Sequence, residues 1–167
     1  MLEIIRKLGD ATPPPIHLSR LLQSPIQDHF SFAVSGENRE VAVLLFESLG
    51  EASANLRFIS EHVGEHGKIR IQFCSDAEVQ GVVLGVFQTK GISRAVNDFR
   101  HRSGVVIISL YPFNGQPQIA ERIFAVLRQQ GIEILGANTA TSVFSCIVAN
   151  SDMEAVISNL KTVFVWQ

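Results

Sequence analysis

Hydrophobic and polar positions along the first half of the chain change their period several times. Strict alternation, typical of half-buried strands, gives way to apolar residues spaced three and four apart, which is typical of one helix face. The helical stripe is clearest at Val41, Leu45 and Leu49, and Ser75 or Asp76 is expected to cap a second helix. The pattern predicts, in order, a strand at 29–34, a helix at 41–49, strands at 55–63 and 69–73, a helix at 79–86 and a strand at 92–99.

The second half of the chain repeats this order. Position 41 matches position 119, an offset of 78 residues, and the helix predicted at 118–130 is expected to stop at Gly131. The other predicted elements are strands at 105–110, 132–138 and 143–148 and a last helix after 150–152. A period this long indicates a duplicated small domain, because solenoid repeats have periods of about 20–50 residues.

The second copy lacks its last strand, while a spare strand at 16–24 precedes the first copy. An unpaired sheet edge favours aggregation, so the simplest arrangement uses the spare strand as the missing edge of the second copy. The two units are then intertwined. The expected organisation is an N-terminal helix and proline-rich spacer at 1–15, a first unit at 16–101 and a second unit at 102–167.

Composition narrows the classes of partner. The 167 residues are 46% hydrophobic with a formal net charge of −2, so no overall field favours nucleic acid or an anionic membrane. The basic run at 100–102 has no interleaved aromatic residues and is expected on a solvated hairpin. No apolar stretch approaches the roughly 18–20 residues of a membrane span. Cys74 and Cys146 lie in strand-like runs without a signal-peptide pattern, so we expect reduced core thiols in a cytoplasmic protein.

Several segments carry a family resemblance. In the second half these are Gly115–Phe124, Gly131–Ile134 and Thr139–Val148, and in the first half Asn55–Ile59 and the turn at 65–67. Together they resemble the regulatory region of aspartokinase, which is built from tandem ACT domains. The resemblance implies an α+β fold of two ferredoxin-like (βαββαβ) ACT units, intertwined, with antiparallel sheets that carry their helices on one face.

The same resemblance implies a non-catalytic regulatory module that binds an amino acid or related small metabolite at the interface between its ACT units. A helix N-terminus would receive the ligand carboxylate, and side-chain oxygens the ammonium. The family's turn, helix and strand positions give the candidate ligand-binding residues Glu37, Asn38, Glu40, Ala42, Asn55, Glu61, Gln116, Glu133 and Ile134. No cofactor and no metal is implied.

The sequence departs from the family pattern at four of these positions. Glu37, Glu40, Glu61 and Glu133 stand where the family has Asp, Gly, Gln and Asn. Acidic side chains favour an ammonium over a carboxylate, and Glu40 adds a Cβ where the backbone could need a positive φ. A cationic ligand, a different pose and an emptied site all stay open. Asn55 has two open interpretations, a contact to the ligand amino group or a cap for its own turn.

Two function classes therefore stay open. The first is the amino-acid-binding regulatory module, expected as a homodimer and with a separate enzyme partner as one option. The second is an assembly or interaction module with a degenerate ligand site. No nucleophile elbow, phosphate loop or paired acid–base arrangement supports an enzyme. His62 and His66 straddle the predicted turn rather than share a helix face, so we expect solvated histidines there rather than metal ligands.

Overall fold

The computed structural model describes residues 15–64 and 67–167. The predicted N-terminal helix, most of the proline-rich spacer, and Glu65 and His66 lie outside the described residues. The first unit consists of β3 (Gln27–Ser35), a short 3-10 turn (Gly36–Asn38), α2 (Glu40–Glu51), β4 (Leu56–Val63), β5 (Lys68–Asp76), a second 3-10 turn (Ala77–Val79), α3 (Gln80–Gln88), α4 (Lys90–Ala95) and the first part of β6 (Asn97–Tyr111).

The second unit uses the rest of β6 and segments from both ends of the described chain. Its other elements are α5 (Pro117–Gln129), β7 (Gly136–Thr139), β8 (Phe144–Ala149), a 3-10 turn (Asn150–Asp152), α6 (Met153–Val163), β9 (Val165–Trp166), β1 (His17–Leu18) and β2 (Arg20–Gln23). Pro117 is the first residue of α5, where its missing N–H leaves no hydrogen bond unmade. Gly131 has a φ of 68° just beyond the helix end, which stops α5 as predicted.

The long strand β6 is shared by the two units. Its first part pairs antiparallel with β3, and its last part pairs antiparallel with both β8 and β2. The sheet order is β4-β5-β3-β6-β8-β7, with β2 beside β6 on the edge of the second unit. Each unit therefore has four antiparallel strands, and a strand from near the N-terminus lies in the C-terminal unit. This confirms the predicted intertwined α+β fold.

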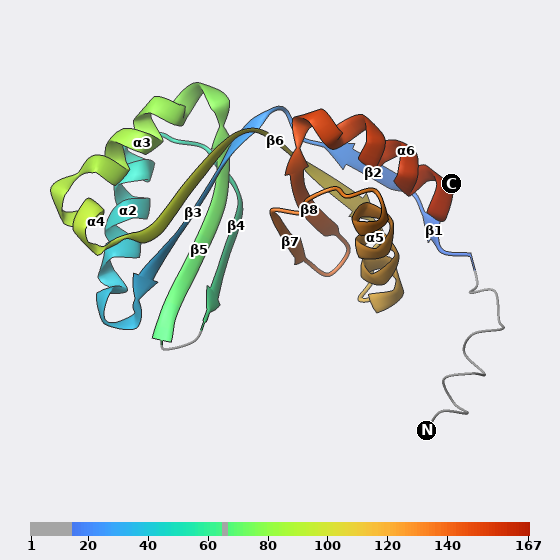
Figure 1. Ribbon diagram of the computed structural model, residues 1–167, viewed down its shortest axis with the longest axis horizontal. Helices are drawn as coiled ribbons and strands as arrows, with labels where there is room; N and C mark the ends of the chain where they lie inside the picture. Colours follow the sequence, from blue (N-terminus) through green and yellow to red (C-terminus); the bar gives the residue numbers. More distant parts are fainter. Residues whose placement is uncertain (1–14, 65–66) are drawn as a thin grey trace.

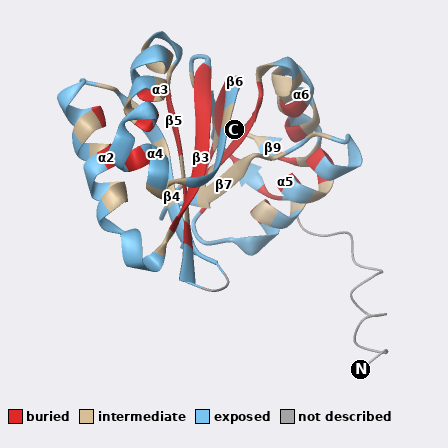
Figure 2. Ribbon diagram, turned by 60° about the vertical axis from the view of Figure 1, so that its left-hand side comes forward, coloured by how far each residue is buried: buried red, intermediate tan, exposed pale blue. Residues whose placement is uncertain are grey.

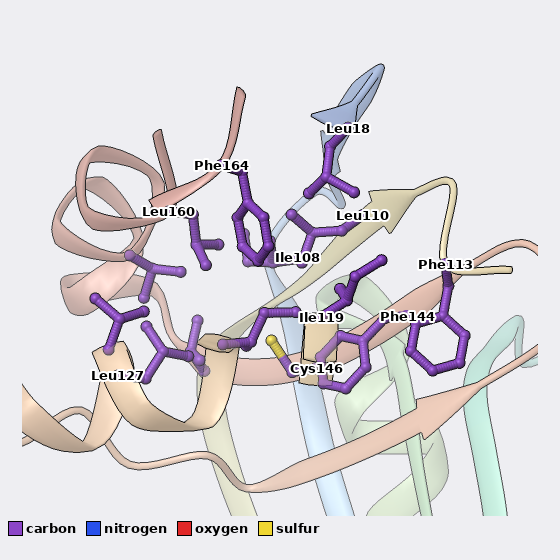
Figure 3. Packing of buried hydrophobic residues seen from close by; sticks show 14 of the residues in the cluster. Leu18, Ile108, Leu110, Phe113, Ile119, Leu127, Phe144, Cys146, Leu160 and Phe164 are labelled. Carbon is purple, nitrogen blue, oxygen red and sulfur yellow. The ribbon is translucent and has the colours of Figure 1, made fainter. Parts of the chain in front are cut away.

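Helices cover only the outer face of each half of the sheet (Figure 1). In both ribbon views α2, α3 and α4 flank one side, α5 and α6 flank the other, and β3, β5 and β7 lie between them (Figure 2). The first unit packs its helices on Phe30, Phe32 and Phe73. The second core includes the residues labelled in Figure 3: Leu18, Ile108, Leu110, Phe113, Ile119, Leu127, Phe144, Cys146, Leu160 and Phe164.

A third apolar cluster joins the two faces that carry no helix. It consists of Cys74, Val105, Ile107 and Ile147, with Phe58 and Leu135 packed against it. Because side chains alternate along a strand, Cys74 lies on the opposite face from Phe73 of the first core. Both cysteines are free and buried, and burial raises the pKa of each thiol to about 12. The two half-sheets thus pack against each other through the middle of the molecule.

Three local predictions are wrong. No separate strand covers 92–99, because residues 90–95 form α4 and the strand at 97 is already β6. The basic run lies inside β6 rather than on a hairpin, and the His101 ring stacks on Phe30 with centroids 4.6 Å apart. Asp76 does not cap α3, since its carboxylate accepts hydrogen bonds from Gln27, Asn55 and Arg57 instead. Tertiary pairing overrides the local preference in each case.

Candidate functional site

A cavity of about 300 Å³ opens between the start of α2 and strands β3, β4 and β5 of the first unit. Its lining residues are Val34, Arg39, Ala42, Val43, Phe46, Glu61, Ile69 and Ile71. Val34 and Ile69 are opposite each other on β3 and β5, and Ile71 lies opposite Glu61 on β4. These buried aliphatic side chains form an apolar wall, while the mouth carries charge.

The two charged residues of this cavity have opposite signs. Arg39 is the residue directly before α2, and Glu61 is on the edge strand β4. Both side chains are exposed, and neither makes an ion pair or side-chain hydrogen bond to any residue that the structure describes. Unpaired opposite charges beside an apolar wall match the groups of an amino-acid zwitterion, which needs a cation for its carboxylate and an anion for its ammonium.

Of the nine predicted site residues, Ala42 and Glu61 line this cavity. Glu37 and Asn38 form the 3-10 turn that leads to Arg39, and Glu40 is the first residue of α2. All three are exposed. Glu40 has helical geometry and does not belong to the residues with positive φ, so its Cβ introduces no backbone strain. The structure thus brings five predicted residues to one end of α2.

Asn55 lies at the other end of β4 and is part of a different cluster. Its amide donates to Asp76 Oδ2 at 2.8 Å, while Arg57 Nε and Gln27 Nε2 donate to Asp76 Oδ1 at 3.0 and 2.9 Å. The hydrogen bonds from Gln27, Asn55 and Arg57 lower the pKa of the Asp76 carboxyl. The structure therefore gives Asn55 a protein partner that neither sequence interpretation included.

The remaining predicted residues belong to the second unit and line no part of this cavity. Gln116 precedes α5, and Ile134 packs on the second core. Glu133 accepts a hydrogen bond from Arg102 at 2.6 Å, and both side chains are largely exposed. Within one chain, these three residues do not meet Glu37 or Glu61 around a shared cavity.

The equivalent place in the second unit lacks both charged residues of this cavity, although Glu121 stands there in place of Val43. The offset of 78 residues places Phe32 on Leu110, and the strand partners of these two residues are Ile71 and Phe144. Glu61, opposite Ile71, then corresponds to Thr139, opposite Phe144. By the same offset, Arg39 corresponds to Pro117, Ala42 to Ala120 and Phe46 to Phe124. The second unit keeps the small and aromatic positions and loses both charged ones.

Arg39 and Phe46 are the site residues that sequence reasoning missed. The candidates were the turn, helix and strand positions that the family resemblance implies for ligand binding, and neither residue was among them. A signal was present, since Arg39 directly precedes the predicted helical stripe and Phe46 lies within it. The missing information was that β4 would carry Glu61 to the same end of α2.

No group of three or more His, Cys, Asp or Glu residues able to hold a metal is found in the part of the chain that the structure describes. His66, half of the spacing considered above, lies outside that part. Among the described residues no helix is both long enough and apolar enough to cross a membrane.

Among known proteins, the matches to this chain come from solved structures. No family model matches the sequence, and no curated protein does. The solved regulatory subunit of aspartate kinase from Thermus thermophilus matches with a TM-score of 0.76 at 14% identity, over 88% of this chain and 99% of that one. A structure of aspartokinase alpha and beta subunits matches with a TM-score of 0.76 at 16% identity, over 87% and 97%.

Aspartate kinase from Synechocystis also matches, with a TM-score of 0.76 and 16% identity. That match covers 90% of this chain but only 28% of the enzyme chain, whereas the regulatory subunit is covered almost completely. At these identities the likeness establishes the fold and not a shared ligand. The chain has the fold of the aspartokinase regulatory region, the tandem ACT arrangement that its sequence resembles.

Proposed function

We propose that the protein is a non-catalytic regulatory module whose first unit binds an amino acid in the cavity beside α2. The observation that carries this proposal is the pair of unpaired opposite charges, Arg39 and Glu61, on an otherwise apolar cavity. Arg39 would hold the ligand carboxylate through two parallel hydrogen bonds, and Glu61 would accept from the ammonium. A volume of about 300 Å³ suits one small molecule.

The surroundings of Arg39 favour particular amino acids. The N-terminus of α2 adds a partial positive charge that attracts the ligand carboxylate. Glu37 and Glu40 lie next to Arg39 and would attract a positively charged ligand side chain. Ala42 leaves room that a larger residue would fill. An amino acid with a basic side chain is therefore the ligand that we propose, and Asn38, Asn55, Gln116, Glu133 and Ile134 stay predictions.

We further propose a homodimer that acts on a separate enzyme chain in the cytoplasm. Strand β4 lies at one end of the sheet order and pairs only with β5 among the described strands. Its outward residues Ile59 and Val63 are 53% and 63% exposed, so a second copy could extend the sheet there and cover them. The free, buried thiols of Cys74 and Cys146 suit a reducing compartment.

The same exposed residues support a second candidate function. Ile59 and Val63 on β4, and Val43 and Leu44 on α2, are exposed apolar side chains on the surface of the first unit, and Val43 also lines the cavity. This surface would serve an assembly module equally well, with the cavity left empty. Regulation requires more than binding, because a ligand shifts two arrangements of the units only if it binds one more tightly than the other.

Titration calorimetry and thermal unfolding against the common amino acids test the proposal. A ligand at about 100 times its Kd stabilises the native state by about 2.7 kcal/mol, which shifts Tm by several degrees. Arg39→Gln and Glu61→Gln should each weaken binding by about tenfold or more. Glu47→Gln, which removes an exposed carboxylate from α2 outside the cavity, is the matched control and should leave binding unchanged.

Either of two results would contradict the proposed amino-acid site. One is the absence of any amino acid that shifts Tm. The other is a shift that Arg39→Gln and Glu61→Gln leave intact. A protein that still forms a dimer under those conditions would then support the assembly module, and light scattering on the same samples measures this.

A further inference from the structure

A second cavity, of about 360 Å³, lies between the two units and shares no lining residue with the first. Arg57 and Phe58 reach it from β4 of the first unit. Ser109, Asn138 and Ser145 reach it from β6, β7 and β8 in the second unit. The cavity therefore sits between the helix-free faces of the two half-sheets, beside the apolar cluster that joins them.

The backbone of β4 is distorted at this cavity. The β4–β5 register shifts between Arg57 and Ser60, and Phe58 has a φ of 52°. Neighbouring residues of a regular strand point to opposite faces, yet Arg57 and Phe58 both line this cavity. A left-handed backbone is strained for an aromatic residue, and such strain persists only where surrounding contacts compensate for it. The bulge thus aims a cation and an aromatic ring together at the second unit.

Several hydrogen-bond donors of this cavity lack protein acceptors within the described residues. Arg57 uses Nε for Asp76, which leaves its two terminal NH₂ groups. The hydroxyls of Ser109 and Ser145 are 2.9 Å apart, so one donates to the other and the second O–H stays available. The side-chain amide of Asn138 makes no hydrogen bond to a described residue. The available groups are mainly donors, and the one charge among the lining residues is positive.

We propose that this cavity is a second ligand site, which takes a small carboxylate and contacts both units at once. The Arg57 guanidinium would hold the carboxylate, held in place itself by the carboxylate of Asp76. Asn138 and the Ser109–Ser145 pair would hydrogen-bond a second polar group of the ligand. Phe58 and Ile107 would pack on its carbon atoms. A short hydroxy acid or dicarboxylate has this combination of groups.

A ligand in this second cavity would contact both units, whereas the first cavity is lined by the first unit alone. The two units are joined by the continuous strand β6, so their relative arrangement depends on how their helix-free faces pack. A ligand that contacts Arg57 on one face and Ser145 on the other would favour one arrangement over another, provided that it binds the two with different affinity. The proposal does not depend on the amino-acid site, because the two cavities share no residue.

Nuclear magnetic resonance titration of the full chain tests the second site. Acetate, succinate and malate would each be added to about 20 mM, with sodium chloride at equal ionic strength as the reference. We expect saturable amide shifts around Arg57, Asn138 and Ser145 with succinate or malate, larger than those with acetate. The same shifts with chloride alone, or no saturable shift with any carboxylate, would overturn the proposal.

Variants separate this site from the first. Arg57→Leu should lower the affinity for the carboxylate ligand by about tenfold or more, since it removes the cation. Arg57→Leu also leaves Asp76 without its cation, so Ser145→Ala supplies an independent variant, with an expected loss of about threefold to tenfold. Arg39→Gln should leave carboxylate binding unchanged, even where it abolishes amino-acid binding. Carboxylate shifts that persist in both Arg57→Leu and Ser145→Ala would show that the ligand binds elsewhere.

Discussion

The two units share the order strand, helix, strand, strand, helix but differ in the residues that they carry at the N-terminal end of the first helix. Ala42 and Phe46 of the first unit have counterparts in Ala120 and Phe124. Arg39 and Glu61 do not, since Pro117 and Thr139 stand in their places. The residues that shape the cavity are thus repeated, and the residues that would hold a charged ligand are found in one unit only.

A second difference concerns how each unit is assembled from the chain. The first unit is one continuous segment from β3 to the first part of β6. The second unit takes its edge strand β2 from before the first unit, and β1 pairs in parallel with β9 at the other end of the chain. A unit whose edge is brought in from far away pays a larger loop-closure entropy when it forms. The proposed amino-acid site thus lies in the locally closed unit, and the other unit depends on long-range closure.

Of the changes proposed to test this difference between the units, shortening Leu18 should cause the largest loss of stability. Leu18 is fully buried in the second core, where it anchors β1. Leu18→Ala removes buried apolar atoms and leaves a cavity, so we expect a loss of about 2–4 kcal/mol in the free energy of unfolding, measured in urea. Leu22→Ala is the control, because Leu22 is 45% exposed and its loss should be below about 1 kcal/mol.

Hydrogen exchange on Leu18→Ala locates the damage. Amides of β8 and α6 should lose protection first, while those of β3 and β5 keep theirs. Equal loss of protection in both units would show that they unfold as one body, and the difference in assembly would then have no energetic meaning.

Filling the cavity beside α2 should have the next largest effect, a loss of affinity for the amino acid. Ala42→Leu places a larger side chain in the space beside α2, so we expect amino-acid affinity to fall by about tenfold or more, which equals about 1.4 kcal/mol. Ala120→Leu makes the same change at the equivalent position of α5 and should leave affinity unaltered. Calorimetry measures both variants. If Ala120→Leu weakens binding as much as Ala42→Leu, the ligand is not confined to the first unit.

Much of this fold was predictable because the hydrophobic period follows it closely. Alternation over 29–34 and the stripe from Val41 to Leu49 appear as β3 and α2, and the offset of 78 residues places Phe32 of β3 on Leu110 of β6. The errors lie where tertiary contacts decide. Residues 92–99 contain β-branched and aromatic positions, yet Ile92 packs into the first core from the short helix α4.

The candidate site was predictable only in part, for a similar reason. Ala42 and Glu61 were found from motif positions, and their meeting in one cavity depends on β4 lying beside α2. Arg39 was missed, since a charged residue before a helix has many roles and nothing local assigns one. The partner of Asn55 was also missed, because Asp76 stands 21 residues away and looks in the sequence like a helix cap.

Asp76 gives the first unit a dependence on pH that can be tested. Hydrogen bonds from Gln27, Asn55 and Arg57 lower its pKa in the folded state below the unfolded value of about 3.9. The stabilisation is therefore complete above about pH 3.9 and is lost as pH falls through the folded pKa. Asp76→Asn should cost less than about 1 kcal/mol at neutral pH, because the carboxylate is partly exposed.

Urea unfolding at a series of pH values measures this. The acid loss of stability should be shallower in Asp76→Asn than in the unmodified protein. Asp98→Asn is the control for removing one negative charge, since Asp98 also lies near a single arginine, Arg70, at 3.6 Å. Parallel curves for the unmodified protein and Asp76→Asn would contradict the assigned hydrogen-bond cluster.

Gly136→Ala, at the contact between the units, should cause the smallest change in the free energy of unfolding. A Cβ added to Gly136 in β7 would lie 2.9 Å from Nε2 of Gln72 in β5. The Gln72 amide holds His29 and Ser60 through hydrogen bonds of 3.2 and 3.0 Å, so moving it weakens both. Replacing glycine also lowers the entropy of the unfolded chain by an amount worth about 0.4–1 kcal/mol. The two effects oppose each other, and we expect Gly136→Ala to cost about 0.5 kcal/mol or less.

A double-mutant cycle separates these two effects. In a Gln72→Ala background the steric conflict is gone, so Gly136→Ala should become stabilising, by about 0.5 kcal/mol. Urea unfolding of the four proteins gives the coupling free energy directly. A change of sign between the two backgrounds would show that the packing of one unit on the other contributes to folding. Additive effects would mean that Gly136 of β7 and Gln72 of β5 have no coupling free energy. The two units would then be linked through β6 and their shared apolar cluster alone.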